Sequence, residues 1–122
     1  MQPEKFSLRN RIKSFRYAIA GILKFVRQEH NARIHAVATV AVIIAGIVFH
    51  VSYSEAAILA VVTGGLWITE MLNTCMERMA DIVHPAAHPT IKFIKDLAAG
   101  AVLVAAITAV VVALFIFIPK VL

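Results

Sequence analysis

An acidic stripe is the first feature of this sequence that could do chemistry. The stretch TEMLNTCMERMAD, residues 69–81, places Glu70, Asn73, Glu77 and Asp81 at intervals of three or four residues. Each residue of a helix advances by about 100° and about 1.5 Å, so these side chains share one face if the stretch is helical. Carboxylates and an amide on one face can bind a divalent cation or accept a proton.

The rest of the chain predicts an integral membrane protein. Of its 122 residues, 61% are hydrophobic and 16% are charged, which is too apolar for a water-soluble domain of this size. A helix needs roughly 20 apolar residues to cross the hydrocarbon layer. We therefore expect one all-α domain, residues 1–122, with membrane spans at about residues 33–51, 55–82 and 90–118. Thr90 is the expected N-cap of the last span.

The basic residues predict the orientation of the spans. Eight of the twelve Lys and Arg residues lie before or at the start of the first span, up to Arg33, and the connection from His50 to Glu55 has none. By the positive-inside rule, the N-terminus and the connection between the last two spans are cytoplasmic. The net charge of +5 points to anionic lipid headgroups as partners rather than to nucleic acid.

An amphipathic helix is expected before the first span, at about residues 6–28. Apolar and basic residues follow separate stripes at helical spacing, which is typical of a helix that lies on the membrane surface. The apolar stripe contains Leu8, Ile12, Phe15, Ile19, Leu23 and Val26, and the basic stripe contains Arg9, Lys13, Arg16, Lys24 and Arg27.

The predicted depth of Glu70 limits the kind of chemistry. In a helix that begins near Glu55, Glu70 lies roughly 22 Å from the outer boundary of a layer roughly 30 Å thick, just inside the cytoplasmic edge. An acid at that depth costs roughly 2.5 kcal/mol or more, so another group must offset its burial. An ion relay would need ionisable groups near the middle of several spans, and the first and third spans have none. We expect the chemistry at the inner interface.

Phosphoryl transfer to a lipid alcohol fits this interface. Acids that converge there need a cation, a basic neighbour or protonation, and Mg²⁺ held by one or two carboxylates and phosphate oxygens is a common solution. Lys95 would stabilise phosphate charge, and Glu70 would accept the proton of an attacking hydroxyl. A membrane-anchored hydroxyl would lie near the depth of Glu70, whereas a nucleotide would arrive from the water beside Glu77, Lys95 and Asp96.

Other interpretations remain open at this point. The acids at the helix end, Asp81 above all, could simply be solvated. A non-catalytic transporter or assembly scaffold could pair them with Lys and Arg at the interface. The histidines lack the closed four-ligand spacing of a structural zinc site.

Residues 68–106, ITEMLNTCMERMADIVHPAAHPTIKFIKDLAAGAVLVAA, resemble the prokaryotic diacylglycerol kinase and undecaprenol kinase family. The shared features are the E-x-x-N-(S/T)-x-x-E-x-x-x-D spacing and the following K-D-x-x-A-G-A-V-L. Glu29 also falls where that family has an acid. The chain has no G-x-x-x-x-G-K-(S/T) motif, in agreement with the family.

The resemblance implies a fold, a site and a reaction. It implies a homotrimer of three-span subunits in the bacterial inner membrane, which transfers the γ-phosphate of ATP with Mg²⁺ to a lipid alcohol in the inner leaflet. Glu70 matches the catalytic base, and Glu29 and Glu77 match the acids that hold the metal with ATP. The positions that match nucleotide contacts are Tyr17, His88, Lys95 and Asp96; Asn73 matches a supporting polar residue, and Asp81 completes the supporting set.

The sequence also departs from the diacylglycerol kinases. It has Asn10 where they carry an Arg in the surface helix, and Ile34 and His35 where they carry a Gln-Glu pair after Arg33. The KDLAAGAVL stretch is closer to the undecaprenol kinase branch. Undecaprenol is therefore the favoured acceptor, with diacylglycerol as the alternative.

Overall fold

The described part of the chain, residues 5–122 of a computed structural model, is helical with short connections and no strand. Residues 1–4 of the predicted 1–122 domain lie outside the described residues. The helices are α1 (Leu8–Gln28), α2 (His30–Val48), α3 (Tyr53–Val83) and α4 (Pro89–Val121).

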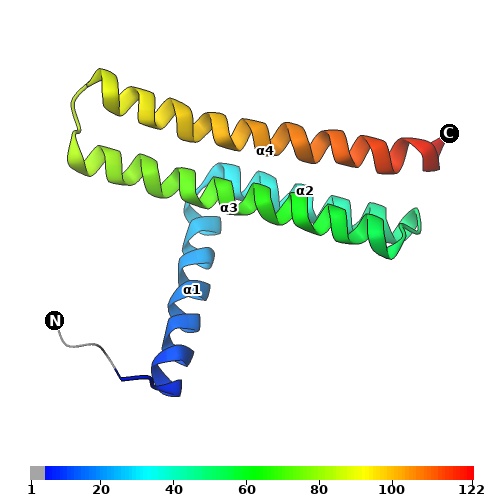
Figure 1. Cartoon of the computed structure of the whole chain (residues 1–122), viewed down its shortest axis with the longest axis horizontal. Coiled ribbons are helices and arrows are strands. Elements are labelled where there is room, and N and C mark those ends of the chain that lie inside the picture. Colours follow the sequence, from blue (N-terminus) through cyan, green and yellow to red (C-terminus); the bar gives the residue numbers. More distant parts are fainter. Residues whose placement is uncertain (1–4) are drawn as a thin grey trace.

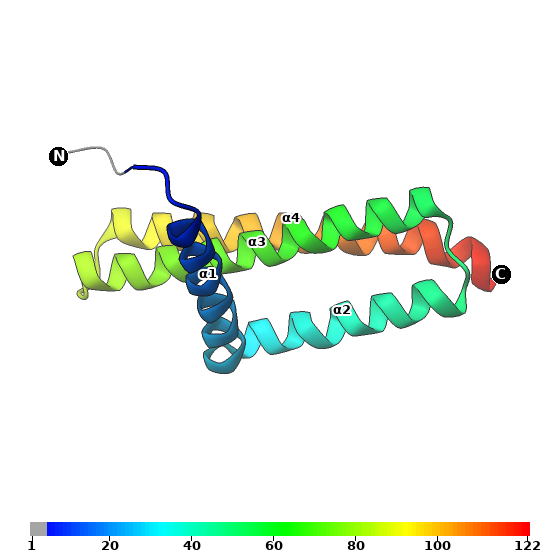
Figure 2. The ribbon, with the colours of Figure 1, turned by 90° about the horizontal axis from the view of Figure 1, so that it is seen from below.

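Three of these helices, α2, α3 and α4, are long and apolar enough to cross a membrane. This confirms the predicted all-α class with three membrane-spanning helices. Helices α3 and α4 lie side by side along most of their length, and α2 runs along α3 on another side (Figures 1 and 2). Helix α1 runs across the direction of the other three (Figure 1). Its location on the membrane surface stays a prediction.

The helices do not coincide with the spans expected from hydropathy. Helix α2 begins at His30, before residue 33, and α4 continues through Pro119 to Val121, beyond residue 118. Hydropathy marks the part of a helix that suits hydrocarbon, whereas backbone hydrogen bonds continue through polar residues at its ends.

A single non-helical residue separates α1 from α2. Glu29 is extended, with φ −104° and ψ 125°, and this lets the chain change direction between the two helices. Arg33 on α2 turns back and donates from Nε to the carbonyl oxygen of Val26 at 3.3 Å, and from its guanidinium to that of Arg27. These bonds satisfy carbonyl groups that the end of α1 leaves without helical partners.

The turn between α2 and α3 contains a capping box. The Ser52 hydroxyl accepts from the Glu55 amide at 3.1 Å, and the Glu55 carboxylate accepts from the Ser52 amide at 2.9 Å. Two amide donors that the helix leaves unpaired are thereby satisfied. His50 has a φ of 52°, a left-handed conformation that non-glycine residues seldom adopt.

The prediction that Thr90 caps the last helix is wrong. The N-cap is His88, whose Nδ1 accepts from the Thr90 amide at 3.1 Å, and Pro89 is the first helical residue. Proline suits that position because its fixed φ is helical and no amide donor is needed there. The helix therefore begins before Thr90.

Little of the described chain is buried. The buried apolar residues are Ala32, Leu59, Ala80 and Ile116, and most large apolar side chains on all four helices are exposed. Exposed apolar surface on this scale needs lipid or other protein to cover it.

The capping box predicts the effect of one substitution. Ser52→Ala removes the hydroxyl that accepts from the Glu55 amide, and the loss of such a cap costs about 1 kcal/mol. We expect a lower unfolding midpoint in detergent, followed by circular dichroism. Ser54→Ala, in the same helical turn, is the control; equal midpoints for the two variants would contradict a stabilising role for the box.

Candidate functional site

The acidic stripe lies on α3, as its spacing predicts, and its environment changes along the helix. Glu70 is 3% exposed and Asn73 is 9% exposed, whereas Glu77 and Asp81 are exposed. The Asn73 amide nitrogen donates to Glu77 Oε1 at 3.4 Å, and Asn73 Oδ1 is buried without a hydrogen-bond partner. The stripe therefore runs from a buried carboxylate to an exposed one, and the amide of Asn73 between them contacts the exposed one.

The buried carboxylate of Glu70 contacts a histidine from the neighbouring helix. His35 Nε2 on α2 lies 3.2 Å from Glu70 Oε2, and the two side chains are 16% and 5% exposed. This is the partner that the predicted depth of Glu70 demands. An ionised carboxylate only accepts hydrogen bonds, so the contact requires a proton on His35 Nε2 if Glu70 is ionised.

A short hydrogen-bonded chain connects α2 and α3 beside this contact. The Thr39 hydroxyl donates to the carbonyl oxygen of His35 at 2.6 Å and accepts from Trp67 Nε1 at 2.8 Å. The Trp67 ring also lies against two other rings, with centroids 6.4 Å from His35 and 6.3 Å from Phe25. The indole thus connects α1, α2 and α3 at the level of Glu70.

Glu29, at the junction of α1 and α2, pairs with α3. Arg78 donates to Glu29 Oε1 at 2.7 Å and to Gln28 Oε1 at 3.2 Å. The Arg78 side chain is 54% exposed and the Glu29 side chain 33% exposed, so this is a solvated ion pair. Arg78 follows Glu77 in the sequence, so Glu29 contacts α3 in the helical turn that carries Glu77, on a neighbouring face of the helix.

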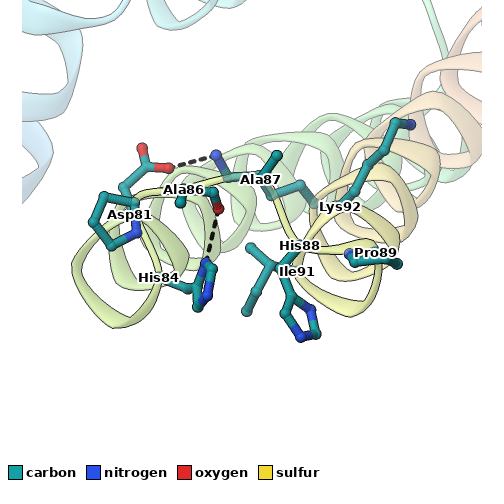
Figure 3. A pocket seen from close by; sticks show the side chains of 10 residues that line it. Asp81, His84, Ala86, Ala87, His88, Pro89, Ile91 and Lys92 are labelled. Carbon is teal, nitrogen blue, oxygen red and sulfur yellow. Dashed lines mark hydrogen bonds and ion pairs between the residues drawn. The ribbon is translucent and has the colours of Figure 1, made fainter.

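The predicted residues Asp81, His88, Lys95 and Asp96 lie at or near the turn between α3 and α4. Lys95 pairs with Asp81 across the two helices, and Lys92 pairs with Asp96 within α4 at 2.5 Å. The His84 and His88 rings lie 5.0 Å apart at their centroids. Asp81, His84, His88, Lys92 and Lys95 line an open pocket of about 540 Å³, which Figure 3 shows from close by.

The structure thus brings the predicted residues together in separate groups. Glu70, Asn73 and Glu77 follow one face of α3, Glu29 pairs separately with Arg78 of α3, and the residues of the turn form a third group. Tyr17 is 71% exposed on α1. Among the described residues, no three His, Cys, Asp or Glu side chains are close enough to hold a metal ion.

The sequence does not predict two contacts, that of His35 with Glu70 and that of Arg78 with Glu29. A signal was present for His35, because both it and Glu70 are polar residues a few positions inside apolar stretches, near ends that the positive-inside rule puts on the same side. Arg78 gave no comparable signal, since basic residues are common at cytoplasmic helix ends.

Fold and site together define an all-helical membrane protein with carboxylates at one end of its spans. Known proteins resemble it over nearly the whole chain. The family model described as prokaryotic diacylglycerol kinase matches residues 16–117. The chain is 41% identical over 108 residues to the undecaprenol kinase of Bacillus subtilis, covering 88% of each protein. It is 41% identical over 114 residues to the diacylglycerol kinase of Synechocystis sp., covering 93% of this chain and 65% of that protein.

The chain belongs to the prokaryotic diacylglycerol kinase family. Its relatives are named as kinases that act on lipid alcohols, and the protein is a lipid kinase. This confirms the family suggested by the stripe and the K-D-x-x-A-G-A-V-L stretch. It also decides against a non-catalytic transporter or scaffold.

The contacts of Arg78 with Gln28 and Glu29 predict that this side chain stabilises the junction of α1 and α2. Arg78→Met removes the contacts of α3 with Gln28 and Glu29, so amide hydrogen exchange at residues 28–33 should become several-fold faster. Lys92→Met is the matched control, because Lys92 pairs within its own helix. Unchanged exchange in Arg78→Met would show that the pair does not hold the junction.

Proposed function

We propose that this protein transfers the γ-phosphoryl group of ATP, with Mg²⁺, to the hydroxyl group of a membrane lipid alcohol. The observation that carries the proposal is the buried carboxylate of Glu70, hydrogen-bonded to His35 within a membrane-spanning helix of a lipid kinase. A base at this depth suits a substrate that stays in the lipid layer.

Glu70 acts as the general base in this proposal. The oxygen of the lipid hydroxyl attacks the γ-phosphorus, and its proton passes to the Glu70 carboxylate. The bond between the γ-phosphorus and its bridging oxygen breaks, so that ADP leaves and a lipid phosphate remains. Burial suits this role, because a carboxylate shielded from water is free to accept the proton of the substrate.

The donor set of the exposed end fits a magnesium ion. Glu29 and Glu77 supply carboxylate oxygens, which Mg²⁺ prefers, and Asn73 Oδ1 is an oxygen without a hydrogen-bond partner. Glu29 and Glu77 would hold the ion, which when bound neutralises charge on the phosphate oxygens. Arg78, which now pairs with Glu29, places a positive charge in the same region.

The turn between α3 and α4 supports a nucleotide site at the water side of the stripe. Lys95 and His88 line the open pocket and supply donors for phosphate oxygens. His88 Nδ1 is already used as an acceptor by the Thr90 amide, so Nε2 is the ring nitrogen that carries the proton of a neutral imidazole. Asp96 and Tyr17 are assigned to the nucleotide by the family resemblance, and Asp81 supports Lys95.

Association of subunits would complete the site. A single chain does not gather three acidic or histidine ligands among its described residues, and its apolar helix faces are largely exposed. The homotrimer that the family resemblance implies would bring acids of neighbouring subunits together. We place the protein in the bacterial inner membrane, with the N-terminus cytoplasmic and α1 on anionic lipid, because the basic residues concentrate before α2.

Undecaprenol is the favoured acceptor and diacylglycerol is the second candidate. The undecaprenol kinase of Bacillus subtilis is matched over 88% of its length, compared with 65% for the diacylglycerol kinase of Synechocystis sp.. Ile34 and His35 also stand where the family resemblance gives diacylglycerol kinases a Gln-Glu pair.

The test of this function is a competition between the two lipids. Purified protein in detergent should transfer labelled phosphate from ATP to undecaprenol in preference to diacylglycerol when both are present at equal concentration. Glu70→Gln should abolish transfer, because the amide cannot accept the proton. Glu55→Gln, at the other end of α3, is the matched control and should remain active. Transfer by Glu70→Gln at the wild-type rate would refute the base, and faster labelling of diacylglycerol would reverse the substrate assignment.

The proposed metal ligand gives a separate prediction. Glu77→Gln replaces a charged ligand by a neutral one, so the Mg²⁺ concentration for half-maximal activity should rise about tenfold, with a smaller effect on the rate at saturating Mg²⁺. A Mg²⁺ titration of the kinase activity measures this shift. A titration curve that coincides with that of the wild type would exclude Glu77 as a ligand.

A further inference from the structure

His35 is a hydrogen-bond partner of the buried Glu70 carboxylate. Within the described chain, Glu70 Oε2 has His35 Nε2 as its hydrogen-bond partner, and no hydrogen bond to Glu70 Oε1 is present. The Glu70 side chain is 5% exposed, so water does little to solvate it. A hydrogen bond from His35 offsets part of the cost of burying the carboxylate.

His35 is itself held in place. Thr39 donates to the backbone carbonyl of His35 and accepts from Trp67, and the Trp67 ring lies against the imidazole. Trp67 and Glu70 are three residues apart, so they lie on the same side of α3. Trp67 of the helix that carries Glu70 therefore restricts the imidazole by ring packing, and a restricted supporting group can keep a carboxylate in one orientation.

We propose that His35 is the positioning residue for Glu70, an inference that rests on the proposed function. Its Nε2–H donates to Oε2 and fixes the plane of the carboxylate. Oε1 is then the atom that accepts the proton of the lipid hydroxyl. His35 touches neither substrate in this arrangement, and its effect on the reaction passes through the orientation of Glu70.

Two substitutions at this position separate positioning from packing. His35→Leu fills the space without a donor, and His35→Gln keeps an N–H that can reach Oε2. A misplaced catalytic group costs about ten- to hundredfold in rate. We expect kcat for lipid phosphorylation to fall by that factor in His35→Leu, with KM for ATP nearly unchanged, and to recover partly in His35→Gln.

The control for these variants is His30→Leu, the same change at an exposed position of α2. It should leave kcat unchanged. Wild-type kcat in His35→Leu, or equal losses in His35→Leu and His35→Gln, would overturn the proposal.

A measurement on the ring itself needs no activity. Nitrogen NMR of ¹⁵N-histidine-labelled protein should find the proton of His35 on Nε2. Glu70→Gln should change the His35 ring signals, whereas Glu77→Gln should leave them in place. A ring protonated only at Nδ1, or signals insensitive to Glu70→Gln, would overturn the inference even in an active enzyme. Intact pairing in a protein that phosphorylates no lipid alcohol would instead refute the proposed function, and the catalytic role of His35 with it.

Discussion

The burial of one carboxylate constrains much of this molecule. Glu70 is 3% exposed on a helix that is otherwise suited to hydrocarbon, and a charge in that setting needs a partner from another helix. His35 supplies it from α2, and the hydrogen bonds through Thr39 and Trp67 keep α2 and α3 in the register that the contact requires. Burial therefore restricts the orientation of the Glu70 carboxylate, whereas an exposed acid would be solvated in many orientations.

Helix α3 is longer than the hydrocarbon layer of a membrane is thick, so it can extend from the layer into water. Its 31 residues span about 46 Å at about 1.5 Å per residue, whereas the hydrocarbon layer is about 30 Å thick. About three turns therefore extend beyond the layer. Counted from Tyr53 at about 1.5 Å per residue, Glu70 falls within roughly the first 30 Å of the helix and Glu77 beyond it, and Asn73 between them donates to Glu77. In the proposed reaction, the residue for the lipid hydroxyl and the residue for the metal and phosphate are therefore seven positions apart on one helix.

The sequence predicted features that depend on periodicity and missed those that depend on helix register. Hydropathy predicts the three helices that are long and apolar enough to span a membrane. Residue spacing predicts that Glu70, Asn73 and Glu77 lie on one face of α3. The pairing of His35 with Glu70 depends on how α2 and α3 are rotated against each other, which neither helix encodes alone. The cap of α4 shows a local version of this limit. His88 and Thr90 can both cap a helix, and Pro89 decides in favour of His88 because it suits the first helical position.

The proposed association of subunits would explain both the weakly buried chain and the divided site. Small residues such as Ala32 and Ala80 are among the few that are buried, and the large apolar side chains face outward. Within lipid, hydrophobicity does not distinguish a lipid neighbour from a protein neighbour, so helices associate through close packing and polar contacts. The polar groups available for such contacts are the acids and bases of α1, of the C-terminal part of α3 and of the N-terminal part of α4. A shared cation between Glu29 and Glu77 of neighbouring copies would therefore bind substrate and subunits together, and assembly and catalysis would depend on the same carboxylates.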